Sequence, residues 1–149
     1  MTAHMPRIEL TKTIRAPRGY AYSVLANVDE LPKAFKNYKS ARLVGKEGDA
    51  AIIEAEVEAE GRTSKWKIKT RYFLNERIEE EIDNDLAVGK ATITFSDVPE
   101  GTKLTLVDDA TFKGAVGKLL GGLAKGRLEK YLDGDLESYK SYVEANKPS

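Results

Sequence analysis

The sequence predicts one α+β domain over residues 1–149: a seven-stranded antiparallel sheet, two short helices after the first strand, and a long C-terminal helix. Three observations predict this class. Charged and apolar residues alternate between residues 51 and 84, two short helical segments follow the first strand, and apolar residues recur at helical spacing from Ala115 onward. At 149 residues, folding buries roughly 70% of the accessible surface, so no second domain is needed.

The first strand is expected over residues 7–15, where apolar and polar side chains alternate and Lys12 falls on the apolar phase. Pro17 ends this strand and suits the first turn of a helix that runs to Asn27. Asp29 is expected to cap a second, shorter helix. Two helices therefore separate the first strand from the others.

Residues 51–72 can form a hairpin whose charges match across its strands. A two-residue loop at Gly61 and Arg62 would pair Glu58 with Lys65, Glu56 with Lys67 and Glu54 with Lys69. The next strand, residues 76–84, would place Glu79, Glu81 and Asp83 against Arg71, Lys69 and Lys67. A basic strand between two acidic strands predicts a sheet with one solvated face, and we expect function on the opposite, dry face.

The remaining elements follow from turns and from a change of period. A short strand is expected over residues 40–46, and residues 87–96 and 102–112 are joined by the turn Pro99-Glu100-Gly101. Pairing across that turn would set Phe95 against Leu104, Ile93 against Leu106, Ala91 against Asp108 and Gly89 against Ala110. The apolar stripe after Ala115 covers about 30 residues, or about 45 Å of helix, enough to cross the sheet.

Composition and missing motifs exclude several classes of protein. The net charge of +0 does not favour a nucleic-acid partner, and the lack of cysteine rules out disulfides and thiolate metal sites. The chain carries no HExxH helix, Gly-x-Ser-x-Gly elbow or phosphate loop, so we predict neither a metal nor a cofactor. No signal peptide or membrane-spanning run is recognisable, which with the missing cysteine favours the cytoplasm. The absence of glutamine beside abundant lysine and glutamate is typical of thermostable proteins, and residues 1–5 could be disordered or vector-derived.

The order of elements resembles the START and Bet v 1 (SRPBCC) superfamily, which has the helix-grip fold. The most specific part is the run Ile14, Arg15, Ala16, Pro17, followed by Tyr22, Val24, Leu25, Ala26, Asn27, Leu31 and Pro32. Residues 28–48 look most like the coenzyme Q-binding and polyketide cyclase-like branches, and residues 87–132 look most like relatives of the G subunit of carbon monoxide dehydrogenase. The resemblance implies a sheet curved around the last helix, with an apolar cavity between them for a lipid, quinone, polyketide or similar molecule.

The resemblance and the inward phase of the strands together suggest the ligand contacts. They are Lys12, Val57, Trp66, Ile68, Tyr72, Glu80, Ala91, Ile93, Phe95, Leu106, Asp108, Leu120 and Leu123. Lys12, Glu80 and Asp108 are the polar exceptions on an apolar phase, and a charge on a dry face is costly unless it is paired or hydrated. They either orient a ligand or occupy the sheet rim or structural ion pairs.

We expect binding or transport of a small hydrophobic molecule rather than catalysis, and two alternatives stay open. The first is a polyketide cyclase-like enzyme in the same cavity, with Glu80 or Asp108 as base and Tyr72 as hydrogen-bond partner. The second is an adaptor, similar to the dehydrogenase G subunit, that touches a membrane surface or a partner protein through basic residues of the last helix: Lys113, Lys118, Lys125, Arg127 and Lys130. The oligomeric state does not follow from the sequence.

Overall fold

The fold was described from a computed structural model of the chain. The structure describes residues 3–4, 7–59, 61–85 and 87–148, with side chains described for 7–59, 61–85, 87–113 and 125–148. Its elements are β1 (Ala3–His4), β2 (Ile8–Ile14), α1 (Arg18–Ala26), the 3-10 helix η1 (Val28–Glu30), α2 (Leu31–Ala34), β3 (Tyr38–Glu47), β4 (Ala50–Ala59), β5 (Arg62–Phe73), β6 (Arg77–Asp83), β7 (Ala87–Val98), β8 (Gly101–Phe112) and α3 (Gly114–Asn146).

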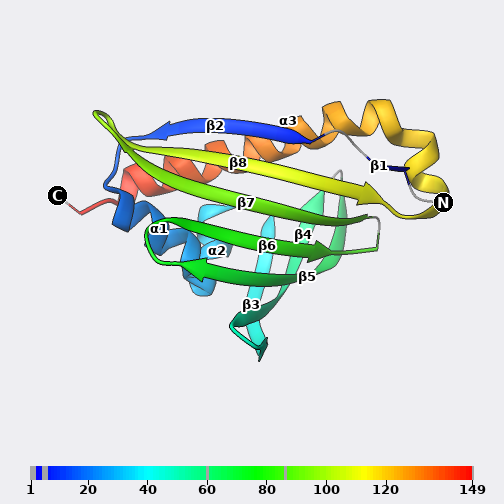
Figure 1. Ribbon diagram of the computed structural model, residues 1–149, viewed down its shortest axis with the longest axis horizontal. Helices are drawn as coiled ribbons and strands as arrows, with labels where there is room; N and C mark the ends of the chain where they lie inside the picture. Colours follow the sequence, from blue (N-terminus) through cyan, green and yellow to red (C-terminus); the bar gives the residue numbers. More distant parts are fainter. Residues whose placement is uncertain (1–2, 5–6, 60, 86, 149) are drawn as a thin grey trace.

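Strands β3 to β8 form an antiparallel meander in sequence order, and β2 closes the sheet by pairing with the other edge of β8. The two-residue strand β1 pairs with the end of the same edge, an element that the sequence does not predict. The curved sheet holds α3 along the side formed by β2 and β8, while α1 and α2 cover one end (Figure 1). The predicted α+β helix-grip fold with seven main strands is confirmed.

The short helices carry the chain from β2 at one edge of the sheet to β3 at the other. Pro17 occupies the position before α1, with extended backbone, so it starts the helix from outside its first turn. The predicted cap at Asp29 is wrong: the side chain of Asn27 accepts a hydrogen bond from the Asp29 amide at 3.1 Å and caps η1. An asparagine at this position satisfies a backbone donor that the helix itself leaves free.

The β4–β5 hairpin differs from its predicted register by two residues. Ala59 pairs with Arg62, Glu56 faces Lys65, and Glu54 faces Lys67. Gly61 has a φ of 77°, which glycine adopts without strain, and this places it at the second loop position. A shift by two residues keeps each side chain on its predicted face, so the charged outer face and the apolar inner face both remain.

The other two predicted registers are confirmed. Glu79, Glu81 and Asp83 on β6 pair with Arg71, Lys69 and Lys67 on β5. Across the β7–β8 hairpin, Phe95 pairs with Leu104, Ile93 with Leu106, Ala91 with Asp108 and Gly89 with Ala110. The strands are longer at the turn than predicted, because Val98 and Gly101 also pair.

A close contact ties the β7–β8 turn to the end of β2. Gly101 has a φ of 142°, and a Cβ atom there would lie 2.4 Å from the carbonyl oxygen of Ile14. Beside it, the Oγ1 of Thr102 donates a hydrogen bond of 2.7 Å to the carbonyl oxygen of Ala16. Only glycine fits the first position, and the buried threonine fixes the chain direction between β2 and α1.

The main core lies at the end of the sheet that α1, α2 and the C-terminal half of α3 cover. Tyr139 and Val143 of α3 are fully buried there, and the Tyr139 hydroxyl donates to the carbonyl oxygen of Ala21 on α1. The Phe35 ring stacks on Tyr139, with ring centroids 5.6 Å apart. This packing fixes the C-terminal half of α3 against the sheet. Within the described residues, no helix combines the length and hydropathy that crossing a bilayer requires.

Candidate ligand site on the concave face

One row of side chains crosses the concave face of the sheet and is polar at three of its positions. Thr70 on β5 pairs with Glu80 on β6, Glu80 with Ala91 on β7, and Ala91 with Asp108 on β8. Because neighbouring strands are about 4.8 Å apart, the two acidic residues lie roughly 10 Å apart at their backbones, with only a methyl side chain between them. We call Thr70, Glu80 and Asp108 the polar row.

The polar row lies between apolar rows. Tyr72, Ile78, Ile93 and Leu106 form the row toward α1, and Ile68, Ile82, Gly89 and Ala110 form the row on the other side. Thr70 is 2% exposed and Asp108 is 8% exposed, while Glu80 is half-buried. The Oγ1 of Thr70 is the one buried side-chain polar atom that lacks a hydrogen-bond partner in the described part of the chain. A buried hydroxyl without a partner is costly, and a ligand could supply that partner.

The two carboxyl groups of the polar row have raised pKa values. Burial, followed by the charge of Asp108, raises the pKa of Glu80 from 4.5 to about 7. Burial, followed by the neighbouring Asp109, raises the pKa of Asp108 from 3.8 to about 6. No cation neutralises either carboxyl group among the described contacts, so desolvation dominates. Both groups can therefore exchange protons near neutral pH.

A second polar group reaches the same space from β3 and α3. Burial raises the pKa of Asp135 to about 6, although the Asn37 amide donates a hydrogen bond of 3.2 Å to this carboxyl group. Burial, then the charges of Glu80 and Asp135, holds the pKa of Tyr38 well above its usual range. Tyr38 thus lies within the electrostatic influence of both the polar row and α3, because the sheet curves.

The concave face is not sealed against solvent. Trp66, Tyr72, Glu80 and Ile82 all lie on the inward phase of β5 and β6, yet each stays partly exposed. Inward residues of β7 and β8 are buried by comparison. Among the described residues, the contacts of α3 with the sheet lie mainly at β2, β8 and β1, and the Tyr131 hydroxyl donates to the carbonyl oxygen of Glu58 on β4.

The structure places most of the predicted ligand contacts together on this face. Val57, Ile68, Ala91, Ile93, Phe95 and Leu106 are buried there, and Trp66 and Tyr72 are partly exposed beside them. Leu120 and Leu123 lie outside the described side chains, so their predicted role stays a prediction. The position of these residues on one face agrees with the phase argument, and their contact with a ligand remains a proposal.

Lys12 has a different environment from the other two inward-phase polar residues. Its Nζ lies 2.7 Å from Asp133 and 2.7 Å from Glu137, both on α3. These hydrogen bonds raise the pKa of Lys12 despite partial burial. Lys12 is therefore one half of a structural ion-pair cluster that joins β2 to α3, the alternative that the sequence left open.

A groove opens beside the helices at the apolar end of the sheet. It has a volume of about 830 Å³ and lies between α1 and η1 on one side and β3 with the β5–β6 turn on the other. Tyr22 forms part of its wall and packs edge-on against Phe95, with centroids 5.5 Å apart. Leu43 and Leu74 at its rim are 52% and 79% exposed. Large exposed leucines around a groove are typical of a binding surface.

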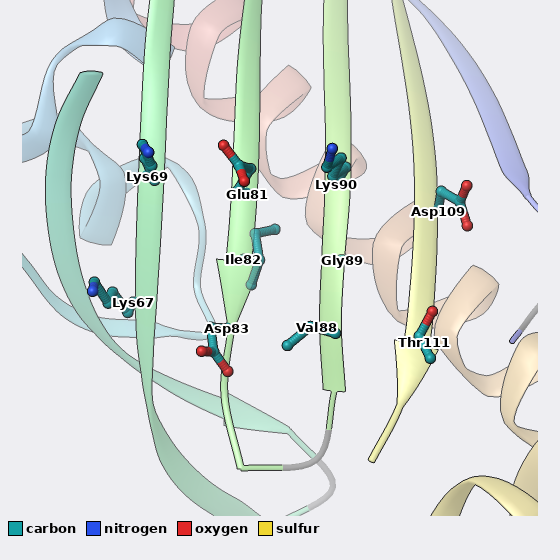
Figure 2. Close-up of a pocket in the computed structure, with 10 residues that line it drawn as sticks. All are labelled: Lys67, Lys69, Glu81, Ile82, Asp83, Val88, Gly89, Lys90, Asp109 and Thr111. Carbon is teal, nitrogen blue, oxygen red and sulfur yellow. The ribbon is translucent and has the colours of Figure 1, made fainter. Parts of the chain in front are cut away.

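A second groove, of about 560 Å³, lies on the outer face of the sheet. Figure 2 shows its lining, which comes from the charged side of β5 to β8, with α3 on the far side of the sheet. Its wall alternates lysines and carboxylates: Lys67, Lys69, Lys90, Glu81, Asp83 and Asp109. This is the predicted solvated ion ladder, and most residues that line it are charged, unlike the mainly apolar lining typical of a site for a hydrophobic ligand.

Phase reasoning missed three residues of the site. Tyr38 comes under the electrostatic influence of both Glu80 and Asp135, and Asp135 accepts a hydrogen bond from Asn37 just before β3. Asp135 does carry a sequence signal, because it lies at helical spacing between Tyr131, Leu132 and Tyr139 on the apolar stripe. Thr70 also carries a sequence signal, because it lies between Ile68 and Tyr72 on the inward phase of the strand.

The basic residues of the last helix are only partly described. Lys113 donates hydrogen bonds of 2.7 Å to the carboxylate of Asp83 and to the carbonyl oxygen of Asn84, so it is engaged at the sheet edge. Lys118 lies outside the described side chains. The adaptor role stays a prediction. Within the described ranges, His, Asp and Glu side chains form no group with the geometry of a metal site.

Solved structures of known proteins share this fold. TTHA0849 from Thermus thermophilus is 20% identical, with a TM-score of 0.84 over 96% of this chain and 100% of that chain. The Zhui aromatase/cyclase from Streptomyces sp. R1128 is 16% identical, with a TM-score of 0.85 over 97% and 100%. A START superfamily protein from Mycobacterium smegmatis is 16% identical, with a TM-score of 0.70 over 96% and 96%.

Sequence comparison gives a family as well as a fold. No curated protein sequence matches the chain. The model of one family, however, matches residues 5–144, which is nearly the whole domain. The predicted START and Bet v 1-like relationship is confirmed, and the chain belongs to the family described as polyketide cyclase/dehydrase and lipid transport.

Proposed function

We propose that this protein binds a small hydrophobic molecule between the concave face of its sheet and α3. The observation that carries the proposal is the polar row, whose buried hydroxyl and two carboxyl groups have no described partner inside an otherwise apolar surface. Binding sites for small molecules combine these features: an apolar wall and a few polar groups that orient the ligand. The family description, which includes lipid transport, supports the same class of function.

The groove beside Tyr22 is the proposed entrance. Tyr22 lines this groove and also contacts Phe95 at the end of the concave face. Tyr72 lies opposite Ile78, in the row next to Glu80, and burial followed by the charges of Glu80 and Tyr22 raises its pKa to about 12. A ligand entering past Leu74 would therefore meet aromatic rings first and the polar row afterwards.

Trp66 offers a direct test of binding. It is the single tryptophan of the chain, and it packs on the concave face beside Tyr38, with ring centroids 6.4 Å apart. Titration with a neutral hydrophobic probe such as a long-chain alcohol should change the intensity and wavelength of its emission in a saturable way. A Leu74→Ala variant should slow this change if the groove is the entrance. No saturable change with any alcohol, quinone or fatty amine would contradict the binding proposal.

A variant that fills the site provides the matched comparison. Ala91 lies in the middle of the polar row on the inner face, and Thr92 is its neighbour on the outer face. Ala91→Leu should project into the proposed ligand space and abolish probe binding, and circular dichroism checks that the variant stays folded despite the added volume. Thr92→Leu adds similar bulk outside and should leave binding unchanged. Equal binding by both variants would place the ligand elsewhere.

A second candidate function is proton-transfer catalysis in the same space, as in an aromatase or cyclase. It is favoured by one observation: burial raises the pKa of Glu80 to about 7, which is the range in which a carboxyl group serves as acid or base. Tyr72 is near enough for Glu80 to raise its pKa further and could hold a carbonyl oxygen by a hydrogen bond. The Zhui aromatase/cyclase, with a TM-score of 0.85, shares the fold alone.

Turnover distinguishes the enzyme from the carrier. A poly-β-ketone mimic should cyclise faster with the wild-type protein, and Glu80→Gln should reduce the rate constant at saturation by about a hundredfold or more. Glu81→Gln changes the next residue, which faces outward, and should leave the rate unchanged. Saturable binding without any acceleration would favour the carrier.

A further inference from the structure

We propose that the ligand of the concave face carries hydrogen-bond donors at its polar end, as an amine or a phenol does, and that a ligand ending in a free carboxylate is rejected. This inference rests on the proposed binding function and specifies the chemistry of that ligand. It follows from the polar groups that face the site, and from the ion pairs that hold Lys12, the one partly buried basic residue on the inward phase of the described strands.

The polar groups around the site are acidic or neutral. Glu80 and Asp108 contribute carboxyl groups from the sheet, and Asp135 contributes a third from α3. Tyr38 from β3 and Tyr72 from β5 face Glu80, and Tyr131 from α3 lies near Asp135. Ionised carboxyl groups only accept hydrogen bonds, so a ligand must supply the donors.

No cation compensates for these acids inside the described site. Three basic residues share the inward phase of the described strands. Lys46 and Arg62 are exposed near strand ends, where Arg62 pairs with Asp85. Lys12 is more buried, and Asp133 and Glu137 hold its ammonium group at 2.7 Å each. Lys36 influences only Asp135, and its own side chain is exposed. A carboxylate ligand would therefore meet two or three like charges in a poorly hydrated space, which is strongly unfavourable.

Thr70 gives a second, independent indication that a ligand completes this site. Its Oγ1 is buried, on the same row as Glu80, and has no hydrogen-bond partner among the described residues. A hydroxyl group can both donate and accept, so it can share a ligand's amine or phenol group with the neighbouring carboxyl. Ala91, whose side chain is a single methyl group, separates Glu80 from Asp108 in this row.

A set of probes with one chain length tests the proposal. Dodecylamine, dodecylresorcinol, dodecanol and dodecanoate share an apolar tail and differ only at the polar end. Each is titrated below its micellar concentration, with Trp66 emission as the readout, near pH 8, which is above the pKa values of about 7 and about 6 of Glu80 and Asp108. We expect the amine or the resorcinol to bind at least about tenfold tighter than dodecanoate. Tighter binding of dodecylamine would mean that the site selects a positive charge, and tighter binding of dodecylresorcinol would mean that it selects neutral hydrogen-bond donors.

Two pairs of variants connect the preference to the polar row. Glu80→Gln and Asp108→Asn each remove one inward charge, and each should reduce the preference of amine over dodecanoate by about tenfold. Glu81→Gln and Asp109→Asn remove the neighbouring outward charges and should preserve that preference. Circular dichroism of all four variants checks that the fold is retained, so that a changed preference reports on the site.

The outcomes separate this inference from the function on which it rests. Tighter binding of dodecanoate than of the donor probes, or a preference that survives Glu80→Gln and Asp108→Asn, overturns the inference and leaves the binding function intact. Failure of all four probes to change Trp66 emission overturns the binding function itself. A donor preference that depends on the inward acids and ignores the outward ones supports both.

Discussion

Three consecutive glutamates on β6 have opposite environments. Glu79 accepts a hydrogen bond of 2.9 Å from Arg77, and Glu81 accepts one of 3.1 Å from Arg71, both on the outer face. Glu80 lies between them in sequence but faces inward, where burial raises its pKa to about 7 and no cation is described beside it. Asp108 and Asp109 repeat this contrast on β8. The two faces therefore use the same residue types differently: the outer carboxylates form solvated ion pairs, and the inner carboxyl groups have no described partner.

The largest difference between the faces should appear when packing is removed. Leu104 is fully buried on the inner side of β8, and Lys103 is exposed on its outer side. Leu104→Ala should lower the free energy of unfolding by about 2–5 kcal/mol, because it removes packing and leaves a cavity. Lys103→Ala should change it by about 0.5 kcal/mol or less. Urea denaturation of both variants measures the difference, and similar losses would mean that the inner face is not the packed one.

A smaller effect, of opposite sign, is expected from removing the inward charge. The folded protein holds the Glu80 proton more tightly than the unfolded chain, because burial raises this pKa from 4.5 to about 7. The cost of ionising Glu80 is therefore absent below about pH 4 and grows as the pH rises to about 7. Glu80→Gln should raise the free energy of unfolding near pH 8 by on the order of 1 to 3 kcal/mol.

The pH dependence of the stability gain tests whether it comes from the charge of Glu80. The gain from Glu80→Gln should shrink toward zero as the pH falls from about 7 to about 4, as measured by urea denaturation at several pH values. Glu81→Gln should give no such gain, because its carboxyl group pairs with Arg71 in the solvated ladder. A destabilising Glu80→Gln at pH 8 would show that the inward carboxylate has a stabilising partner after all.

The smallest effect is expected from a single outer ion pair. Glu79→Gln removes one of the two carboxylate partners of Arg77, and water competes for the charges because both side chains are partly exposed. The free energy of unfolding should fall by about 0.5 kcal/mol or less, and the loss should vanish in about 1 M salt because screening weakens such pairs. A loss as large as that of Leu104→Ala would mean that the outer ladder is a cooperative network.

Much of the fold could be predicted because strand phase has a period of two. That period placed Glu80, Asp108 and Lys12 on the inner face. Charge matching predicted the β5–β6 register, and the turn Pro99-Glu100-Gly101 predicted the β7–β8 register. Charge matching could not fix the β4–β5 register, since acidic and basic residues face each other in either of two alignments. The predicted alignment matches one more lysine, yet Gly61 with its positive φ sets the loop. Turn geometry thus outweighed one exposed ion pair.

The site was predictable only in part for a related reason. Phase shows which face a side chain is on, but it does not show how far the sheet curves or where α3 packs. Tyr38 comes under the electrostatic influence of Glu80 and of Asp135 on α3, and Lys12 is drawn away from the polar row by Asp133 and Glu137, each 2.7 Å from its ammonium group. The ligand-facing polarity therefore depends on docking between distant elements, which the local pattern does not encode.

The place of β2 in the sheet has a consequence for how the chain assembles. Every strand pair from β3 to β8 joins sequence neighbours, so these hairpins can close one after another over short loops. Strand β2 must instead find β8, with Ile14 opposite Thr102, far along the chain. Closing so long a loop is slow, so strands β3 to β8 should form the folding nucleus before β2 pairs with β8. The contact of Gly101 with Ile14 would then form last, and a bulkier residue at position 101 would hinder the pairing of β2 with β8.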